Sequence, residues 1–106
     1  VTDLTPLKGL PLTSLDCTKT SVKDLTPLKG MLLTRLHIWE TRITDLTPLA
    51  GMKLELFTFT PGKITKGIEI VRGMKTIEWF RTTSGYTKAR MTPEEFWKKY
   101  DAGEFD

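Results

Sequence analysis

Aspartate recurs at a constant interval in the first half of the chain, and carboxylates in a row could bind a metal ion. The residues concerned are Asp3, Asp24 and Asp45, one in each copy of a repeated phrase. On neighbouring strands of a parallel sheet such residues would lie about 4.8 Å apart. Each of them, however, precedes a Thr-Pro pair that favours the start of a helical turn, where free N–H groups need a side-chain acceptor. We therefore expect the aspartates to cap helical turns, and we predict no metal site.

A thiol beside an imidazole could form a nucleophile and its general base. Cys17 and His37 are the only cysteine and histidine of the chain. The pair would need both side chains on one face. Alternation along the predicted strands places Cys17 in the core and turns His37 outward, between the apolar residues Leu36 and Ile38. The sequence therefore predicts a buried thiol and a surface imidazole, and we predict neither an enzyme nor a bound cofactor.

Aromatic and arginine side chains form the third group of candidates. The outward positions of the predicted strands include Arg35, His37, Trp39, Trp79 and Arg81. Trp and Arg are strongly enriched among the residues that contribute most to protein–protein binding. We therefore predict a protein-binding surface formed by these five residues. The alternative is that the two tryptophans only cover neighbouring side chains on the sheet.

Composition argues against nucleic acid and membrane as partners. Aromatic residues next to arginines also suit single-stranded nucleic acid, but acidic residues such as Asp16, Glu55 and Glu78 are interspersed among them. The net charge is only +3, and the longest run of basic residues is Lys98-Lys99. No apolar stretch approaches the roughly 18 residues of a membrane span. We predict a protein partner, with no nucleic acid and no membrane.

Two repeated patterns must position these residues. Asp-Leu-Thr-Pro-Leu occurs three times and is followed each time by Lys-Gly or Ala-Gly. A second pattern, with apolar residues at its first, fourth and sixth positions, begins at Leu12, Leu33 and Leu54. Its fourth copy matches best from Ile77, two positions later than the regular interval predicts. A period of roughly 20 residues is typical of a solenoid. The patterns predict about four parallel strands, each joined to a 3₁₀ or short α turn that ends at a glycine.

This second pattern is similar to the leucine-rich repeat, with threonine or glycine in the usual asparagine position. The Asp-Leu-Thr-Pro-Leu connector resembles the bacterial short repeats of internalins and of planctomycete proteins. The resemblance covers residues 1–87, with three regular 21-residue units and an atypical unit from about residue 65. It implies an α/β fold, a right-handed solenoid that binds its partner on the concave face of the sheet.

The same resemblance implies an alternative role. Arrays of the planctomycete type are often attached to serine/threonine kinase domains, so the chain could be a structural or regulatory appendage of an enzyme encoded upstream. The first residue, Val1, falls inside the repeat pattern. We therefore expect the C-terminal end of a longer array, whose uncapped N-terminal edge favours self-association.

The last part of the chain, residues 88–106, is expected to be a C-terminal cap helix and tail. Thr92-Pro93-Glu94-Glu95 is a capping box with proline at the first helical position. Phe96, Trp97 and Tyr100 follow on one face of the helix and would close the apolar core. Four strands leave an open face of only about 250 Å², whereas a stable interface needs about 800 Å² per partner. Binding by these repeats alone should be weak.

Overall fold

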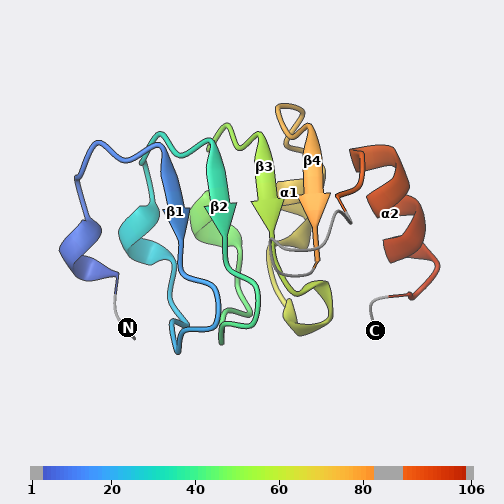
Figure 1. Cartoon of the computed structure of the whole chain (residues 1–106), viewed down its shortest axis with the longest axis horizontal. Coiled ribbons are helices and arrows are strands. Elements are labelled where there is room, and N and C mark those ends of the chain that lie inside the picture. The colour runs from blue at the N-terminus through green and yellow to red at the C-terminus, as the bar shows by residue number, and fades with distance from the viewer. Residues whose placement is uncertain (1–3, 83–89, 105–106) are drawn as a thin grey trace.

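Four short strands lie side by side in one parallel sheet (Figure 1). The computed structural model describes residues 4–82 and 90–104. The strands run in chain order and are β1 (Ser14–Asp16), β2 (Arg35–His37), β3 (Leu56–Thr58) and β4 (Trp79–Arg81). Their central residues pair in the order Leu15, Leu36, Phe57 and Phe80. The prediction of four parallel strands, with two extra positions before the last, is confirmed.

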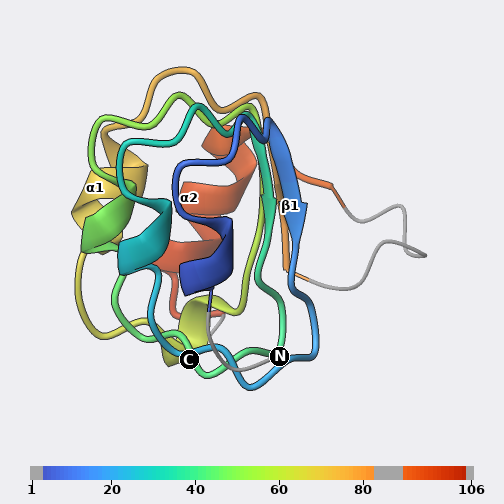
Figure 2. The ribbon, with the colours of Figure 1, turned by 90° about the vertical axis from the view of Figure 1, so that its left-hand side faces the viewer.

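Short 3₁₀ helices form a second layer against one face of the sheet (Figure 2). They are η1 (Thr5–Leu7), η2 (Thr26–Leu28) and η3 (Thr47–Leu49). A carboxylate oxygen of Asp24 accepts the N–H of Thr26 at 2.9 Å, and Asp45 accepts that of Thr47 at 2.8 Å.

Two details of these turns differ from the prediction. A leucine occupies the formal N-cap, one residue after the aspartate, and proline is the second residue of each turn instead of the first. The aspartate still reaches the first N–H of the turn because its short side chain can accept from the backbone two residues ahead. Asp3 lies outside the described residues.

Glycine ends each of the three turns in a left-handed conformation. Gly9, Gly30 and Gly51 have φ angles of 80°, 82° and 80° and follow the last residue of the turn and its C-cap. A left-handed φ is costly for residues with a Cβ. The prediction that these glycines end the turns is therefore confirmed.

The fourth unit departs from the other three. An extra 3₁₀ turn, η4 (Pro61–Lys63), follows β3, and a five-residue helix, α1 (Ile68–Arg72), takes the place of the 3₁₀ turn. Gly67 stands where the earlier units have a buried leucine, and its φ is 85°. A Cβ on Gly67 would lie 2.6 Å from the backbone nitrogen of Thr47. This position therefore needs glycine both for its backbone conformation and for the close approach to η3.

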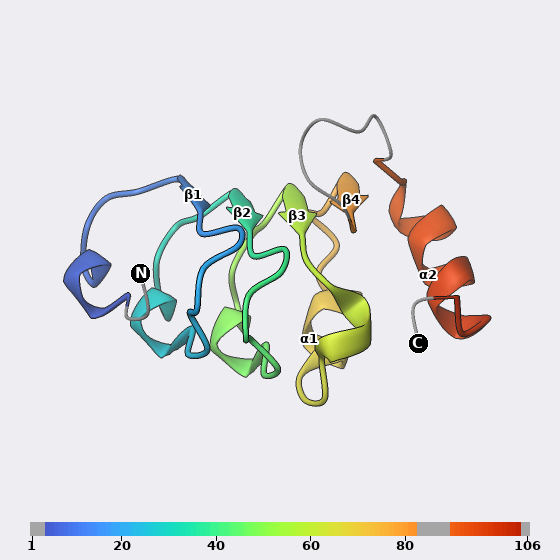
Figure 3. The same ribbon diagram turned by 60° about the horizontal axis from the view of Figure 1, so that its bottom comes forward.

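The last helix, α2 (Pro93–Asp101), lies beyond β4 at the end of the row of strands (Figures 1 and 3). The predicted capping box is present, because Thr92 and Glu95 each accept the other's backbone N–H. Met91 and Phe80 exchange backbone hydrogen bonds of 2.8 Å, which occupy the outer edge of β4. At the far end of α2, Asp101 accepts two hydrogen bonds from Arg72 of α1. The expected boundary between residues 87 and 88 lies outside the described residues.

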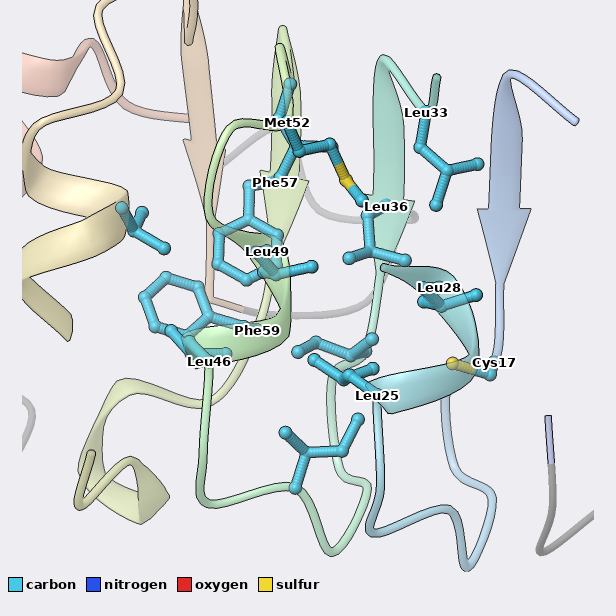
Figure 4. Close-up of a cluster of buried hydrophobic side chains, with 14 of the residues drawn as sticks. Cys17, Leu25, Leu28, Leu33, Leu36, Leu46, Leu49, Met52, Phe57 and Phe59 are labelled. Carbon is cyan, nitrogen blue, oxygen red and sulfur yellow. The ribbon is translucent and has the colours of Figure 1, made fainter. Parts of the chain in front are cut away.

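The apolar core fills the space between the sheet and the layer of turns (Figure 4). Phe57 stacks on Phe59 with 4.4 Å between ring centroids, and Phe80 stacks on Phe96 of the cap at 4.2 Å. Leu33 and Leu36 in the second unit are fully buried. Their equivalents in the first unit, Leu12 and Leu15, are only partly buried. This less covered end is the edge for which the sequence predicts self-association, and that association stays a prediction.

Candidate functional site

Two rows of side chains cross the face of the sheet that points away from the 3₁₀ helices. The strand register aligns Ser14, Arg35, Leu56 and Trp79 in one row. It aligns Asp16, His37, Thr58 and Arg81 in the other. Because alternate residues of a strand point to opposite faces, the central row of Leu15, Leu36, Phe57 and Phe80 points into the core. We call the other surface, formed by the two outer rows, the open face.

A hollow of about 450 Å³ lies on this open face. It brings together four of the five residues that the sequence predicts for binding, namely Arg35 and His37 of β2 with Trp79 and Arg81 of β4. The hollow is also lined by four residues outside the predicted binding set, namely Glu55, Leu56, Glu78 and Arg90. The strand pattern already places the first three on the outward side of the sheet, whereas Arg90 lies outside the predicted strands and no pattern signals it.

Trp39 is the predicted residue that does not line the hollow. It follows β2 in a turn in which Glu40 has a left-handed φ of 53°. Its ring centroid lies 5.4 Å from the Nζ of Lys19, and its carbonyl oxygen accepts the N–H of Lys19 at 2.9 Å. Trp39 is therefore paired with the neighbouring turn and not with Arg35 or Arg81.

Arg90 reaches the hollow from the segment that leads into α2. Its guanidinium carbon lies 4.3 Å from the ring centroid of Trp79. At this distance the cation and the aromatic face attract each other by about 0.5–1 kcal/mol at an exposed site. The contact places a third arginine beside Arg35 and Arg81 and covers one side of the Trp79 ring.

The arginines of the hollow are not neutralised within the part of the chain that the structure describes. The two ion pairs found among residues 4–82 and 90–104 join Arg72 to Asp101 and Lys99 to Glu104. Glu55 and Glu78 lie at the hollow but form no pair within 4.0 Å there. Among the residues of those same ranges, the buried Nε of Arg81 has no hydrogen-bond partner. A buried donor without an acceptor costs about 1–3 kcal/mol, and more when the group is charged.

His37 is held in place by the neighbouring strand. Its Nδ1 lies 2.9 Å from the hydroxyl oxygen of Thr58, a side chain that is only 2% exposed. Burial lowers the pKa of His37 below its ordinary value of 6.5; the positive charges of Arg81 and Arg35 act in the same direction, and Asp16 opposes them. The imidazole is therefore neutral at pH 7.

This depressed pKa predicts how stability depends on pH. As the pH falls, His37 becomes protonated near pH 6.5 in the unfolded chain and only at a lower pH in the folded chain. Between these two pKa values the unfolded chain binds more protons, so a lower pH favours unfolding. The contribution of the neutral imidazole is complete above pH 6.5 and is lost as the pH falls through the folded pKa. We expect the wild type to lose stability relative to His37→Gln between pH 7.5 and pH 5, by about 1 kcal/mol or less. Urea unfolding of both proteins checks this, and a constant difference between them would contradict it.

Cys17 lies in the core, and the ring of His37 lies on the open face. The thiol is 5% exposed and donates to the backbone carbonyl of His37 at 3.5 Å, not to its ring. Burial, reinforced by the charge of Asp16, raises the pKa of the Cys17 thiol to about 11. A thiolate nucleophile would need the opposite shift. The geometry gives no support to a Cys–His pair.

Metal centres and membrane spans are not found in residues 4–82 and 90–104. Within those ranges no group of three or more His, Cys, Asp or Glu side chains could hold a metal ion. No helix there is long and apolar enough to cross a membrane.

In comparisons with models of protein families, with curated protein sequences and with solved protein structures, the chain had no match.

Proposed function

We propose that this chain is a leucine-rich-repeat module that binds another protein on the open face of its sheet, at and around the hollow. The repeat assignment is supported by the apolar pattern and by strand partners that are one repeat apart. In such a right-handed solenoid the open face is the concave side, and the 3₁₀ layer is the outer side. The C-terminal cap then belongs to the end of the array, because α2 covers the core beside β4.

The main support for the binding proposal is that arginine and tryptophan side chains converge on one hollow. Arg35 belongs to β2, whereas Trp79 and Arg81 belong to β4. The two strands are separated by β3, yet all three residues line the hollow. Their guanidinium groups form no ion pair with another residue in the described ranges. Tryptophan and arginine are the side chains that contribute most at protein interfaces.

The small size of the open face sets the expected strength of binding. The hollow is within the range of ligand pockets, which begins at about 300 Å³. The sheet around it is far smaller than the area that a stable complex buries on each partner. We therefore expect dissociation constants in the range of about 10 µM to 1 mM for a peptide that contacts this face alone.

The proposal can be tested with a displayed library of random peptides selected on the immobilised chain. We expect Trp79→Ala to weaken the selected peptides by about tenfold or more. Trp39→Ala should weaken them less, because Trp39 lies outside the hollow. The matched control is Arg42→Ala, an exposed arginine that does not line the hollow.

Two results would overturn the proposal. One is that no peptide is enriched, in which case a structural or regulatory appendage of an enzyme becomes the better interpretation. The other is that the enriched peptides bind Trp79→Ala as well as they bind the wild type. Circular dichroism of each variant shows whether the fold is retained, and Arg35→Ala gives a second reading if Trp79→Ala does not fold.

A further inference from the structure

Arg81 is one of the arginines that line the hollow, and β4 places it two positions after Trp79 on the same face of the sheet. Its Nε is buried and has no hydrogen-bond partner among residues 4–82 and 90–104. Within those residues its guanidinium group also forms no ion pair. Buried polar groups in folded proteins are almost always satisfied. The charge of Arg81 therefore has no counter-ion in the described chain, and a bound partner could supply one.

The charges around the hollow indicate what that acceptor is. The described lining holds three guanidinium groups, of Arg35, Arg81 and Arg90, and two carboxylates, of Glu55 and Glu78. With a neutral His37, these described residues carry one unbalanced positive charge. A single carboxylate balances it, whereas a phosphate brings nearly two negative charges at pH 7 and would be repelled by both glutamates. Guanidinium groups also match a carboxylate with two parallel hydrogen bonds.

Apolar surface lies beside this charged centre. Leu56, between the two arginine-bearing strands, and the ring of Trp79 both line the hollow. Arg90 stacks at 4.3 Å from that ring and so presents its charge next to an aromatic surface. A ligand with an apolar side chain next to its carboxylate would contact both kinds of surface at once.

We propose that the hollow binds one carboxylate of an acidic segment in the partner protein, with the guanidinium groups of Arg35, Arg81 and Arg90 as its donors and Leu56 and Trp79 in contact with an adjoining apolar side chain. This inference rests on the proposed function, because it names the chemistry of the partner for the same site. The carboxylate belongs to an aspartate, a glutamate or a chain terminus. Glu55 and Glu78 at the lining exclude more strongly charged anions.

The test compares three short synthetic peptides with blocked ends and one central residue between two leucines. The central residue is glutamate, glutamine or phosphoserine. NMR titration follows the side-chain Nε–H of Arg81 and the indole N–H of Trp79. We expect the glutamate peptide to shift both signals and to bind about tenfold more tightly than the glutamine peptide. Arg81→Lys keeps the charge but removes the forked guanidinium geometry, and it should weaken the glutamate peptide by a similar factor, while Arg42→Lys should not.

Each opposite result overturns the inference. These results are equal affinity of the glutamate and glutamine peptides, tighter binding of the phosphoserine peptide, or no saturable shift up to about 5 mM. Unchanged affinity of a folded Arg81→Lys protein would also overturn it. Its failure is distinguishable from failure of the proposed function. If the displayed library enriches peptides without acidic residues and Trp79→Ala weakens them, binding on the open face stands and only the carboxylate is wrong.

Discussion

Replacing Phe96 by alanine is expected to destabilise the protein by about 3–5 kcal/mol, the usual cost of removing a buried phenylalanine. Phe96 is the fully buried residue of α2. Its ring stacks on Phe80 of β4 at 4.2 Å and lies 5.6 Å from that of Phe59. Because a domain of this size is stable by only about 5–15 kcal/mol, the loss is a large part of the total. The melting temperature should fall by at least about 12 °C.

Two controls identify the cause of that loss. Glu94→Ala changes an exposed residue of the same helix and should alter stability by less than about 0.5 kcal/mol. Hydrogen exchange should accelerate at the backbone N–H groups of Phe80 and Met91, which pair with each other at the outer edge of β4. If Phe96→Ala costs less than about 1 kcal/mol, the cap does not close the core in the way described.

The second large effect is expected at Gly67. Gly67→Ala should cost about 1–2 kcal/mol for its left-handed φ and a further 1–3 kcal/mol or so for crowding. The crowding arises because the new Cβ would lie 2.6 Å from the nitrogen of Thr47 and 2.9 Å from the carbonyl carbon of Leu46. Both atoms belong to the backbone, so neither can move aside as the end of a flexible side chain would.

Gly30→Ala is the matched control for this second effect. Gly30 has nearly the same φ, 82° against 85°, but a Cβ there would meet no atom within 4 Å. Chemical denaturation of the two variants therefore separates the conformational cost from the cost of close approach. Equal destabilisation of both proteins would show that the contact between the fourth unit and η3 is looser than the structure has it.

The hollow depends on the cap through β4. Phe96 of α2 stacks on Phe80 of β4, and β4 carries both Trp79 and Arg81 to the hollow. A variant that loosens the cap should therefore weaken binding as well as stability. Substitutions on the open face itself, such as Arg35→Ala, should change binding with little effect on stability, because Arg35 is exposed.

The candidate site can be predicted from the sequence only in part. Because strands alternate with a period of two, the sequence predicts Arg35, His37, Trp79 and Arg81 on the open face. Trp39 follows the same alternation but does not line the hollow, because β2 ends at His37 and Trp39 lies in the turn that contains Glu40. The left-handed φ of Glu40 is uncommon for a residue other than glycine, and nothing in the local sequence signals it.

Four features can be read from the linear pattern alone, which are the parallel strands, their register, the 3₁₀ turns and the capping box of α2. Each of these depends on contacts that repeat at a fixed spacing or lie within a few residues, so a linear pattern carries them. Three further features emerge only from the three-dimensional packing: α1 replaces the fourth 3₁₀ turn, Gly67 approaches η3, and Arg90 joins Arg35 and Arg81 at one hollow. These features depend on where side chains end in space and on how the chain returns to the sheet, and no spacing along the sequence specifies either.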